Sequence, residues 1–288
     1  MTSLERLRLP APAKLNLMLR VVGRRSDGYH LLQTVFQFID RCDWISLQAQ
    51  DDGLISLANP LPGVPEGADL TVRAARLLRE ASGREGLGVR LAVEKILPMG
   101  GGLGGGSSDA ATVLLGLNAL WRLGFSLDDL AALGLQLGAD VPVFVRGYAA
   151  WAEGVGEHLE PMPDLPEPWY VVVVPPCHVA TGAVFSAPGL TRDNKPIKIR
   201  DFLAGQQENH CLPVVSEMYP VVQEALAALG GHAEQPRLTG TGACVFAAFA
   251  GESDARAAAS RLAGSWQCFV ARGLNESPLH STLARAVN

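Results

Sequence analysis

The stretch PMGGGLGGGSSDAAT, residues 98–112, decides what the rest of the chain can be, because six of its fifteen residues are glycine. It follows VRLAVEKI (89–96), where apolar residues alternate with period two, as in a half-buried strand. From Ser107 onward, Ala, Leu and Val recur at helical spacing, and a serine there can cap the helix. Glycines let a backbone approach a ligand closely, and amides at a helix N-terminus attract anions. The stretch therefore predicts a phosphate-binding loop.

Local patterns leave the type of phosphate loop open. A Walker A loop needs a lysine that this stretch lacks. Gly100, Gly102 and Gly105 match GxGxxG, but a dinucleotide fold also needs an acid at the end of the next strand. Asp128 and Asp129 stand near that spacing, yet SLDDLAALG reads as a helix start. A flexible linker is disfavoured, since a strand and a helix flank the glycines directly.

Composition excludes several classes of protein. The 288 residues are 48% hydrophobic and 18% charged, which is typical of a globular chain long enough for two domains. A net charge of −5 argues against a nucleic-acid partner. No apolar run reaches membrane-span length, and no signal or transit peptide is seen, so we expect a cytoplasmic protein with no membrane partner.

Cysteine and histidine spacing predicts neither a disulfide framework nor a zinc site. The five cysteines form no CxxC pair, which favours free thiols in a reducing compartment. The six histidines show no HxxxH or HxxE spacing, so we expect no metal held by a protein cluster.

Helix-like and strand-like segments are mixed along the chain, as in an α+β protein. Residues 70–81 predict a helix, and residues 253–264 predict another, with Ser253 as its N-cap. The β-branched run at 170–174 and the apolar run at 243–249 predict buried strands. The Pro-rich stretch at 160–168 favours a domain boundary.

PMGGGLGGGSSDAA closely resembles the second motif of the GHMP kinases, a family that includes galactokinase, homoserine kinase, mevalonate kinase and phosphomevalonate kinase. Further stretches resemble one branch of that family, in order and over nearly the whole chain: 11–40, 137–157, 237–249 and 269–280. Long strings of this kind are far more specific than a lone glycine pattern.

The resemblance implies an α+β fold of two domains with the active site in the cleft between them. Residues 1–152 would form a ribosomal-S5-domain-2-like domain for ATP and catalysis, and residues 153–271 a ferredoxin-like substrate domain. The tail, about 272–288, would pack back on the first domain.

The resemblance also implies an activity. ATP would be the co-substrate, with Mg²⁺ bound through it and through Ser107 or Ser108. The acceptor would be a small molecule, a cytidine diphosphate derivative of methylerythritol. Its 2-hydroxyl would be phosphorylated in the non-mevalonate route to isoprenoid precursors. Oligomeric state stays open.

Lys14 and Asp140 are the catalytic pair that the resemblance implies. By local sequence, Asp140 lies at the edge of an element facing a cleft, or simply caps a helix. Lys14 and Asn16 alternate with leucines and share one face of a strand, which could equally be solvated. In the catalytic role, Asp140 would accept or orient the proton of the attacking hydroxyl, and Lys14 would stabilise negative charge. Whether Asp140 is a base or only positions the hydroxyl stays open.

The remaining site residues divide between the two substrates. The expected ATP-binding residues are Pro98, Met99, Gly100, Gly101, Gly102, Leu103, Gly104, Gly105, Gly106, Ser107, Ser108, Lys95 and Asp69. Glycines there would let amides surround the triphosphate. Asp69 stands where this branch usually has asparagine, which puts a side-chain contact to adenine in doubt. The expected substrate-binding residues are Asn16, Tyr29, His30, Thr181, Phe185, Gly240, Thr241 and Gly242, with Tyr29 and Phe185 enclosing the pyrimidine.

Three rival hypotheses remain. Another GHMP kinase, such as homoserine or mevalonate kinase, would lack the Tyr29/Phe185 pair. A degenerate member that binds nucleotide without catalysis would not need to keep Lys14 and Asp140. An RNA-binding protein follows only from the resemblance of the first domain to RNA-associated folds, and the acidic charge argues against it.

Overall fold

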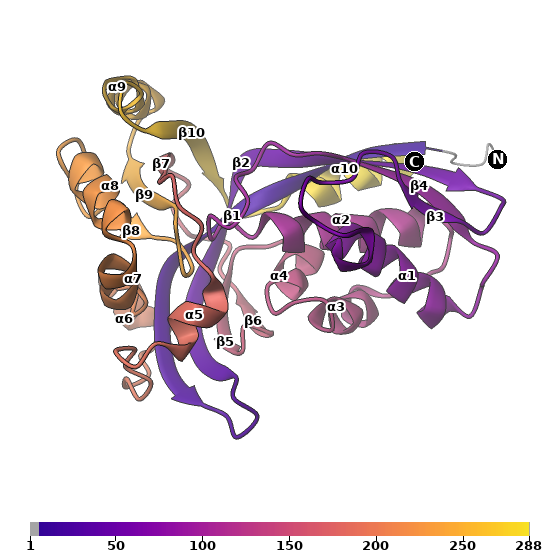
Figure 1. Cartoon of the computed structure of the whole chain (residues 1–288), viewed down its shortest axis with the longest axis horizontal. Helices are drawn as coiled ribbons and strands as arrows, with labels where there is room; N and C mark the ends of the chain where they lie inside the picture. The colour runs from indigo at the N-terminus through magenta and orange to yellow at the C-terminus, as the bar shows by residue number, and fades with distance from the viewer. Residues whose placement is uncertain (1–5, 288) are drawn as a thin grey trace.

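The computed structural model describes residues 6–287 and shows two halves joined by long strands (Figure 1). In one half, helices α1 to α4 cover one face of strands β1 to β4. In the other half, α7, α8 and α9 lie along the outer side of strands β7 to β10. The strands are β1 (Arg6–Arg24), β2 (His30–Gln50), β3 (Ile55–Leu57), β4 (Gly88–Glu94), β5 (Ala150–Gly154), β6 (His158–Pro161), β7 (Trp169–Val174), β8 (Arg237–Leu238), β9 (Val245–Phe249) and β10 (Gln267–Leu274).

The helices are short apart from those that cover the sheets. They are η1 (Glu66–Ala68), α1 (Leu70–Ser82), α2 (Gly105–Leu120), α3 (Leu127–Leu135), α4 (Val141–Arg146), α5 (Thr181–Ser186), α6 (Ile199–Leu203), α7 (Leu212–Met218), α8 (Pro220–Gly230), α9 (Glu252–Leu262) and α10 (Pro278–Val287). The predicted helix over 70–81 and the strands over 89–96, 170–174 and 243–249 are all present within a few residues. In the described part of the chain, no helix is both long and apolar enough to span a membrane.

Two predicted caps are wrong. Helix α2 begins at Gly105 with Gly104 at the N-cap, two residues before the serines, and no side chain caps it. Helix α9 has Gly251 at its N-cap, so Ser253 lies inside the first turn. The expected helix start at SLDDLAALG is correct, because Ser126 and Asp129 form a reciprocal capping box on α3.

The first core lies between the helices and the sheet of the first half. Helix α2 is buried on nearly all sides, since it packs between α1 and strands β1 and β2. That position explains why its sequence is apolar almost throughout rather than striped. The first core thereby fixes the start of α2, where the glycine loop ends.

The second core lies between β7, β9, β10 and the helices α8 and α9. The antiparallel hairpin of β1 and β2 extends into it, because Leu19 and Val21 of β1 belong to this core. Strand β10 also serves both halves: its residues 267–272 pair with β7, and Gly273 and Leu274 pair with β2. The predicted division of the chain into one domain of residues 1–152 and another of residues 153–271 stays a prediction.

The C-terminal segment returns to the first half, where α10 packs on β1 and α2. Before it reaches α10, it bonds to the loop that follows α4. The Ser277 amide donates to the Gly147 carbonyl at 2.9 Å, and the Ala149 amide donates to the Asn275 carbonyl at 2.8 Å. The ring of His280 lies against the Cα of Gly147, where a Cβ would collide with it. This segment, residues 275–280, therefore fixes the C-terminal end of α4, and we call it the strap.

Candidate active site

A cleft of about 1010 Å³ lies between the two halves. It collects the β1–β2 hairpin, the glycine loop, the start of α1, the start of α4 and helix α5. Almost every predicted site residue lines it. The two exceptions are Ser108, whose hydroxyl is buried without a hydrogen-bond partner among the described residues, and Gly242, which faces Leu238 in the second core.

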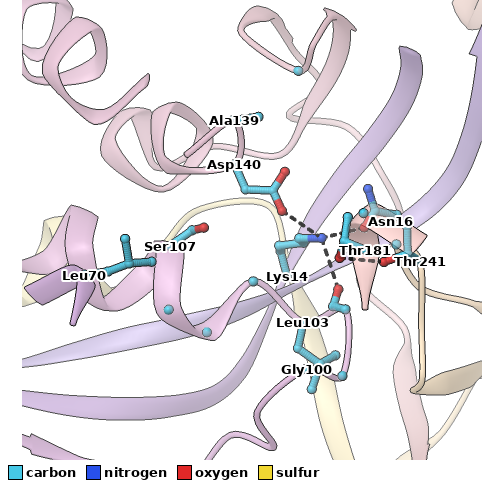
Figure 2. Close-up of a pocket in the computed structure, with 18 of the residues that line it drawn as sticks. Lys14, Asn16, Leu70, Gly100, Leu103, Ser107, Ala139, Asp140, Thr181 and Thr241 are labelled. Atoms are coloured by element: carbon cyan, nitrogen blue, oxygen red, sulfur yellow. Dashed lines mark hydrogen bonds and ion pairs between the residues drawn. The ribbon is translucent and has the colours of Figure 1, made fainter. Parts of the chain in front are cut away.

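Lys14 and Asp140 meet in the middle of this cleft (Figure 2). Strand β1 carries Lys14 with a side chain only 3% exposed, and Asp140 precedes the first turn of α4 with a side chain 34% exposed. The Lys14 ammonium lies 3.2 Å from Asp140 Oδ2. Asp140 thus keeps solvent-accessible carboxylate surface in the cleft, while Lys14 is enclosed.

Three acceptors surround the Lys14 ammonium, which matches its three N–H donors. Besides Asp140, they are Asn16 Oδ1 at 2.5 Å and the Gly102 carbonyl at 3.1 Å. Lys14 and Asn16 do share one strand face, as the alternation predicts. A buried cation is tolerated only where its donors are satisfied, so this arrangement holds the charge at one point.

The glycine loop packs against the second glycine cluster, TGTGA (239–243). The amides of Ala243 and Cys244 donate to the carbonyls of Gly100 and Gly101 at 3.3 and 3.1 Å. Gly102 has φ +75°, and a Cβ there would collide with the Thr239 carbonyl. The glycines therefore do more than clear space for a ligand: they allow two loops from different halves to lie in direct contact.

Lys95 lies at the wall of the cleft between two carboxylates. Its ammonium is 2.5 Å from Asp43 Oδ2 and 2.9 Å from Asp109 Oδ2. Burial and the nearby Asp43 charge raise the pKa of Asp109 to about 7, although the Lys95 charge acts to lower it. The second oxygen of Asp43 accepts from the amides of Ile96 and Leu97 at 2.5 and 2.8 Å. The cluster ties β2 and α2 to the segment that enters the glycine loop.

Asp69 lines the cleft, but its carboxylate is used by its own helix. It stands at the N-cap of α1 and accepts from the amides of Thr71 and Val72 and from the Thr71 hydroxyl. Capping requires only an acceptor, which explains how aspartate fills this position.

The far end of the cleft is aromatic. His30, which begins β2, stacks on Phe185 of α5 with ring centroids 4.9 Å apart and planes inclined by 26°. Tyr29 is 63% exposed beside them. Thr181 and Thr241 share a hydrogen bond of 3.0 Å at the side of the same cavity (Figure 2). The structure thus places His30, rather than Tyr29, against Phe185, and both rings line the cleft.

Sequence reasoning missed several residues of the site. Asp109 stands within the quoted glycine stretch, and only its spacing after the serines could have marked it. Asp43 and Arg192 gave no local signal. Arg192 lies in the loop after α5 and donates to His30 Nε2 at 3.1 Å. Asp43 and Lys95 are 52 residues apart in the chain, and Arg192 and His30 are 162 apart, so no periodicity connects either pair.

Comparison with known proteins agrees with this geometry. Sequence profiles of the N-terminal and C-terminal domains of GHMP kinases match residues 69–148 and 195–267. A 4-diphosphocytidyl-2-C-methyl-D-erythritol kinase of Methylococcus capsulatus is 59% identical, over 96% of this chain and 94% of the relative. One of Pseudomonas aeruginosa PAO1 is 55% identical, over 98% of this chain and 99% of the relative.

Solved structures agree as well. A crystal structure of 4-(cytidine 5'-diphospho)-2C-methyl-D-erythritol kinase superposes with a TM-score of 0.80 at 34% identity, covering 93% of this chain and 99% of that one. Homoserine kinase of Cytophaga hutchinsonii shares the fold, with a TM-score of 0.70 at 16% identity, covering 96% of this chain and 97% of that one. The expected α+β fold and a small-molecule kinase activity that uses ATP are thereby confirmed. The chain belongs to the GHMP kinase family, and within it to the 4-diphosphocytidyl-2-C-methyl-D-erythritol kinases.

Proposed function

We propose that this protein transfers the γ-phosphoryl group of ATP to the 2-hydroxyl of 4-diphosphocytidyl-2-C-methyl-D-erythritol, giving ADP and the 2-phosphate, in the non-mevalonate route to isoprenoid precursors. The observation that carries the proposal is the Lys14–Asp140 pair, 3.2 Å apart, between a glycine loop and an aromatic pocket in one cleft. The names of the relatives support the choice of acceptor.

Asp140 receives or orients the proton of the attacking hydroxyl. Its carboxylate is accessible from the cleft and is held at the start of α4, so a hydroxyl can reach it without moving the backbone. Lys14 holds this carboxylate in place through the ion pair and lowers the cost of negative charge on the transferring group. Phosphoryl transfer depends mainly on positioning and charge stabilisation, which is what this pair supplies.

ATP lies along the glycine loop, from Pro98 to Ser107, with its phosphates at the start of α2. The amides of the first helical turn and the helix dipole both favour the anion there. The adenine end lies between Lys95 and Asp69. Because the carboxylate of Asp69 already caps α1, we expect its backbone, not its side chain, to contact the base.

Magnesium fits the oxygen donors that this cleft offers. Mg²⁺ prefers hard oxygen ligands and usually binds through one or two protein groups together with substrate phosphates. The Ser107 hydroxyl and the Asp140 carboxylate line the cleft, whereas the buried Ser108 does not. We therefore assign the metal to Ser107 and Asp140, where it would offset the charge of the β- and γ-phosphates.

The acceptor occupies the other end of the cleft. Its pyrimidine lies against the aromatic side chains that line this end, with Phe185 on the inner side and the exposed Tyr29 on the solvent side. His30 and Asn16 bond the base and the ribose edge. Thr181, Gly240 and Thr241 line the path of the diphosphate towards Lys14.

The test is ADP release from MgATP with the cytidyl substrate, compared between the native chain and Asp140→Asn. We expect turnover that needs the cytidyl substrate and falls at least ~100-fold in the variant, the scale of a lost acid–base group. The control is Asp254→Asn, which changes an exposed carboxylate on α9 and should leave turnover unchanged.

Three results would contradict the proposal. Turnover with homoserine or mevalonate but not with the cytidyl substrate would assign the chain another acceptor. ATP binding without turnover on any of these acceptors would make it a non-catalytic member. Full turnover by Asp140→Asn would remove Asp140 from the mechanism while leaving the kinase activity.

A further inference from the structure

The aromatic end of the cleft is organised by a residue that lies behind it. Arg192, partly buried in the loop after α5, uses its guanidinium on four acceptors. Nη2 donates to the carbonyls of Phe185 and Ala187 at 2.9 and 2.7 Å, and Nη1 donates to that of Leu190 at 2.9 Å. Nε donates to the ring of His30 at 3.1 Å. The planar, rigid guanidinium thus connects the helix that carries Phe185 with the hairpin that carries His30.

The contact with His30 also decides where the imidazole holds its proton. Arginine has no acceptor atoms, so His30 Nε2 must be the unprotonated nitrogen. A neutral imidazole has one N–H, which must then be on Nδ1. Among the described residues, Nδ1 has no hydrogen-bond partner within the chain, so its N–H is free for a ligand.

The charge state agrees with this tautomer. Burial and the nearby Arg192 and Arg24 charges hold the pKa of His30 below its ordinary value. A protonated ring would turn an N–H towards the N–H of Arg192, which is repulsive. His30 therefore stays neutral at pH 7 and offers one donor and no charge.

We propose that Arg192 is a positioning residue of the acceptor site: it fixes His30 as the Nδ1–H tautomer and holds its ring stacked on Phe185, ready to donate to an acceptor atom of the pyrimidine. The inference rests on the proposed function for the identity of that ligand. The tautomer itself is a property of the free protein and can be measured without substrate.

The decisive measurement is the two-bond ¹H–¹⁵N correlation spectrum of the protein labelled on its histidines, at pH 7.5. The His30 signals are assigned by their disappearance in His30→Gln. We expect the native protein to show His30 as the Nδ1–H tautomer, and Arg192→Gln to shift it towards the Nε2–H form that free imidazole prefers. A native His30 that is Nε2–H or doubly protonated would overturn the proposal.

Kinetics give a second, independent readout. In Arg192→Gln we expect KM for the cytidyl substrate to rise about 10- to 100-fold, the scale of one charge-assisted hydrogen bond, with kcat and KM for ATP within about threefold of native. Arg192→Lys keeps the charge but not the fork, and should fail to restore KM. Arg200→Gln, which removes an exposed arginine of α6, is the matched control.

The outcomes separate the inference from the function on which it rests. Two kinetic results would mean that Arg192 acts only as a structural charge. One is an equal rise in KM for ATP and for the cytidyl substrate in Arg192→Gln, and the other is a native KM in Arg192→Lys. If circular dichroism shows that a variant does not fold, the His30 tautomer of the native protein still tests the proposal. Absence of turnover by the native chain on the cytidyl substrate would remove the proposed function and leave the tautomer result standing.

Discussion

The two ends of the cleft are built from different parts of the chain. At the phosphate end, main-chain groups dominate: two glycine-rich loops from different halves lie in contact, and the Gly102 carbonyl of one of them binds the Lys14 ammonium. At the pyrimidine end, side chains dominate: one guanidinium aligns two rings. A site made of main chain tolerates no added atoms, whereas a site made of side chains can lose a member and keep its shape. Substitutions should therefore act differently at the two ends.

Gly102→Ala should have the largest effect. A Cβ there collides with the Thr239 carbonyl, and alanine disfavours φ +75°, each at a cost of about 1–3 kcal/mol. The collision also moves the carbonyl that binds Lys14. We expect kcat/KM for both substrates to fall about 100-fold or more, the scale of a misplacement near 1 Å.

Steady-state kinetics and a thermal melt check this prediction. Gly264→Ala is the control, because nothing lies within 4 Å of the Cβ it would add. Near-native kinetics and melting of Gly102→Ala would mean that the two loops are not in contact. The contrast drawn between the phosphate end and the pyrimidine end would then be wrong.

Phe185→Leu should have a smaller and more selective effect. It removes one base stack, worth ~1–3 kcal/mol, while leucine keeps part of the apolar contact. We expect KM for the cytidyl substrate to rise about tenfold, with KM for ATP unchanged. Initial rates against each substrate in turn measure both constants. A matching rise in KM for ATP would show that the two ends are not separable.

His280→Gln tests how the phosphate end holds Asp140, through the strap at the other end of α4. Burial lowers the pKa of His280, against a smaller opposite effect of the Phe144 and Val145 backbone. A histidine whose pKa is lowered in the folded state adds stability that is present above about pH 6.5, and this stability is lost as the pH falls through the pKa of the folded state. The native protein should therefore lose more stability than His280→Gln between pH 7.5 and pH 5.

The expected difference is a larger fall in Tm for the native protein than for His280→Gln between the two pH values. Melts at the two pH values measure it, and other buried histidines cancel in the comparison. His158→Gln, at an exposed position, should melt like the native protein at both. Identical pH dependence in His280→Gln and the native protein would mean that the strap carries no titrating contact.

Local sequence predicted much of the phosphate end, because short-range patterns determine it. Strand periodicity placed Lys14 and Asn16 on one face, and the glycine run marked the loop before α2. The start of α2 was misjudged because Gly104 adopts a left-handed conformation that takes the N-cap without a side chain. The tie from Asp43 and Asp109 to Lys95, and that from Arg192 to His30, join distant segments, and no local propensity encodes them.

The long hairpin limits how the cleft can open. Opening about a hinge needs a flexible loop at the junction, yet strands β1, β2 and β10 run from one half into the other without a break in the main chain. Swivelling one half against the other would bend all three strands at once. We expect substrates to enter by movement at the cleft's rim, around the exposed Tyr29 and Met99, while the angle between the halves stays nearly constant. The shared strands make the molecule stiff along the axis that joins its two substrates.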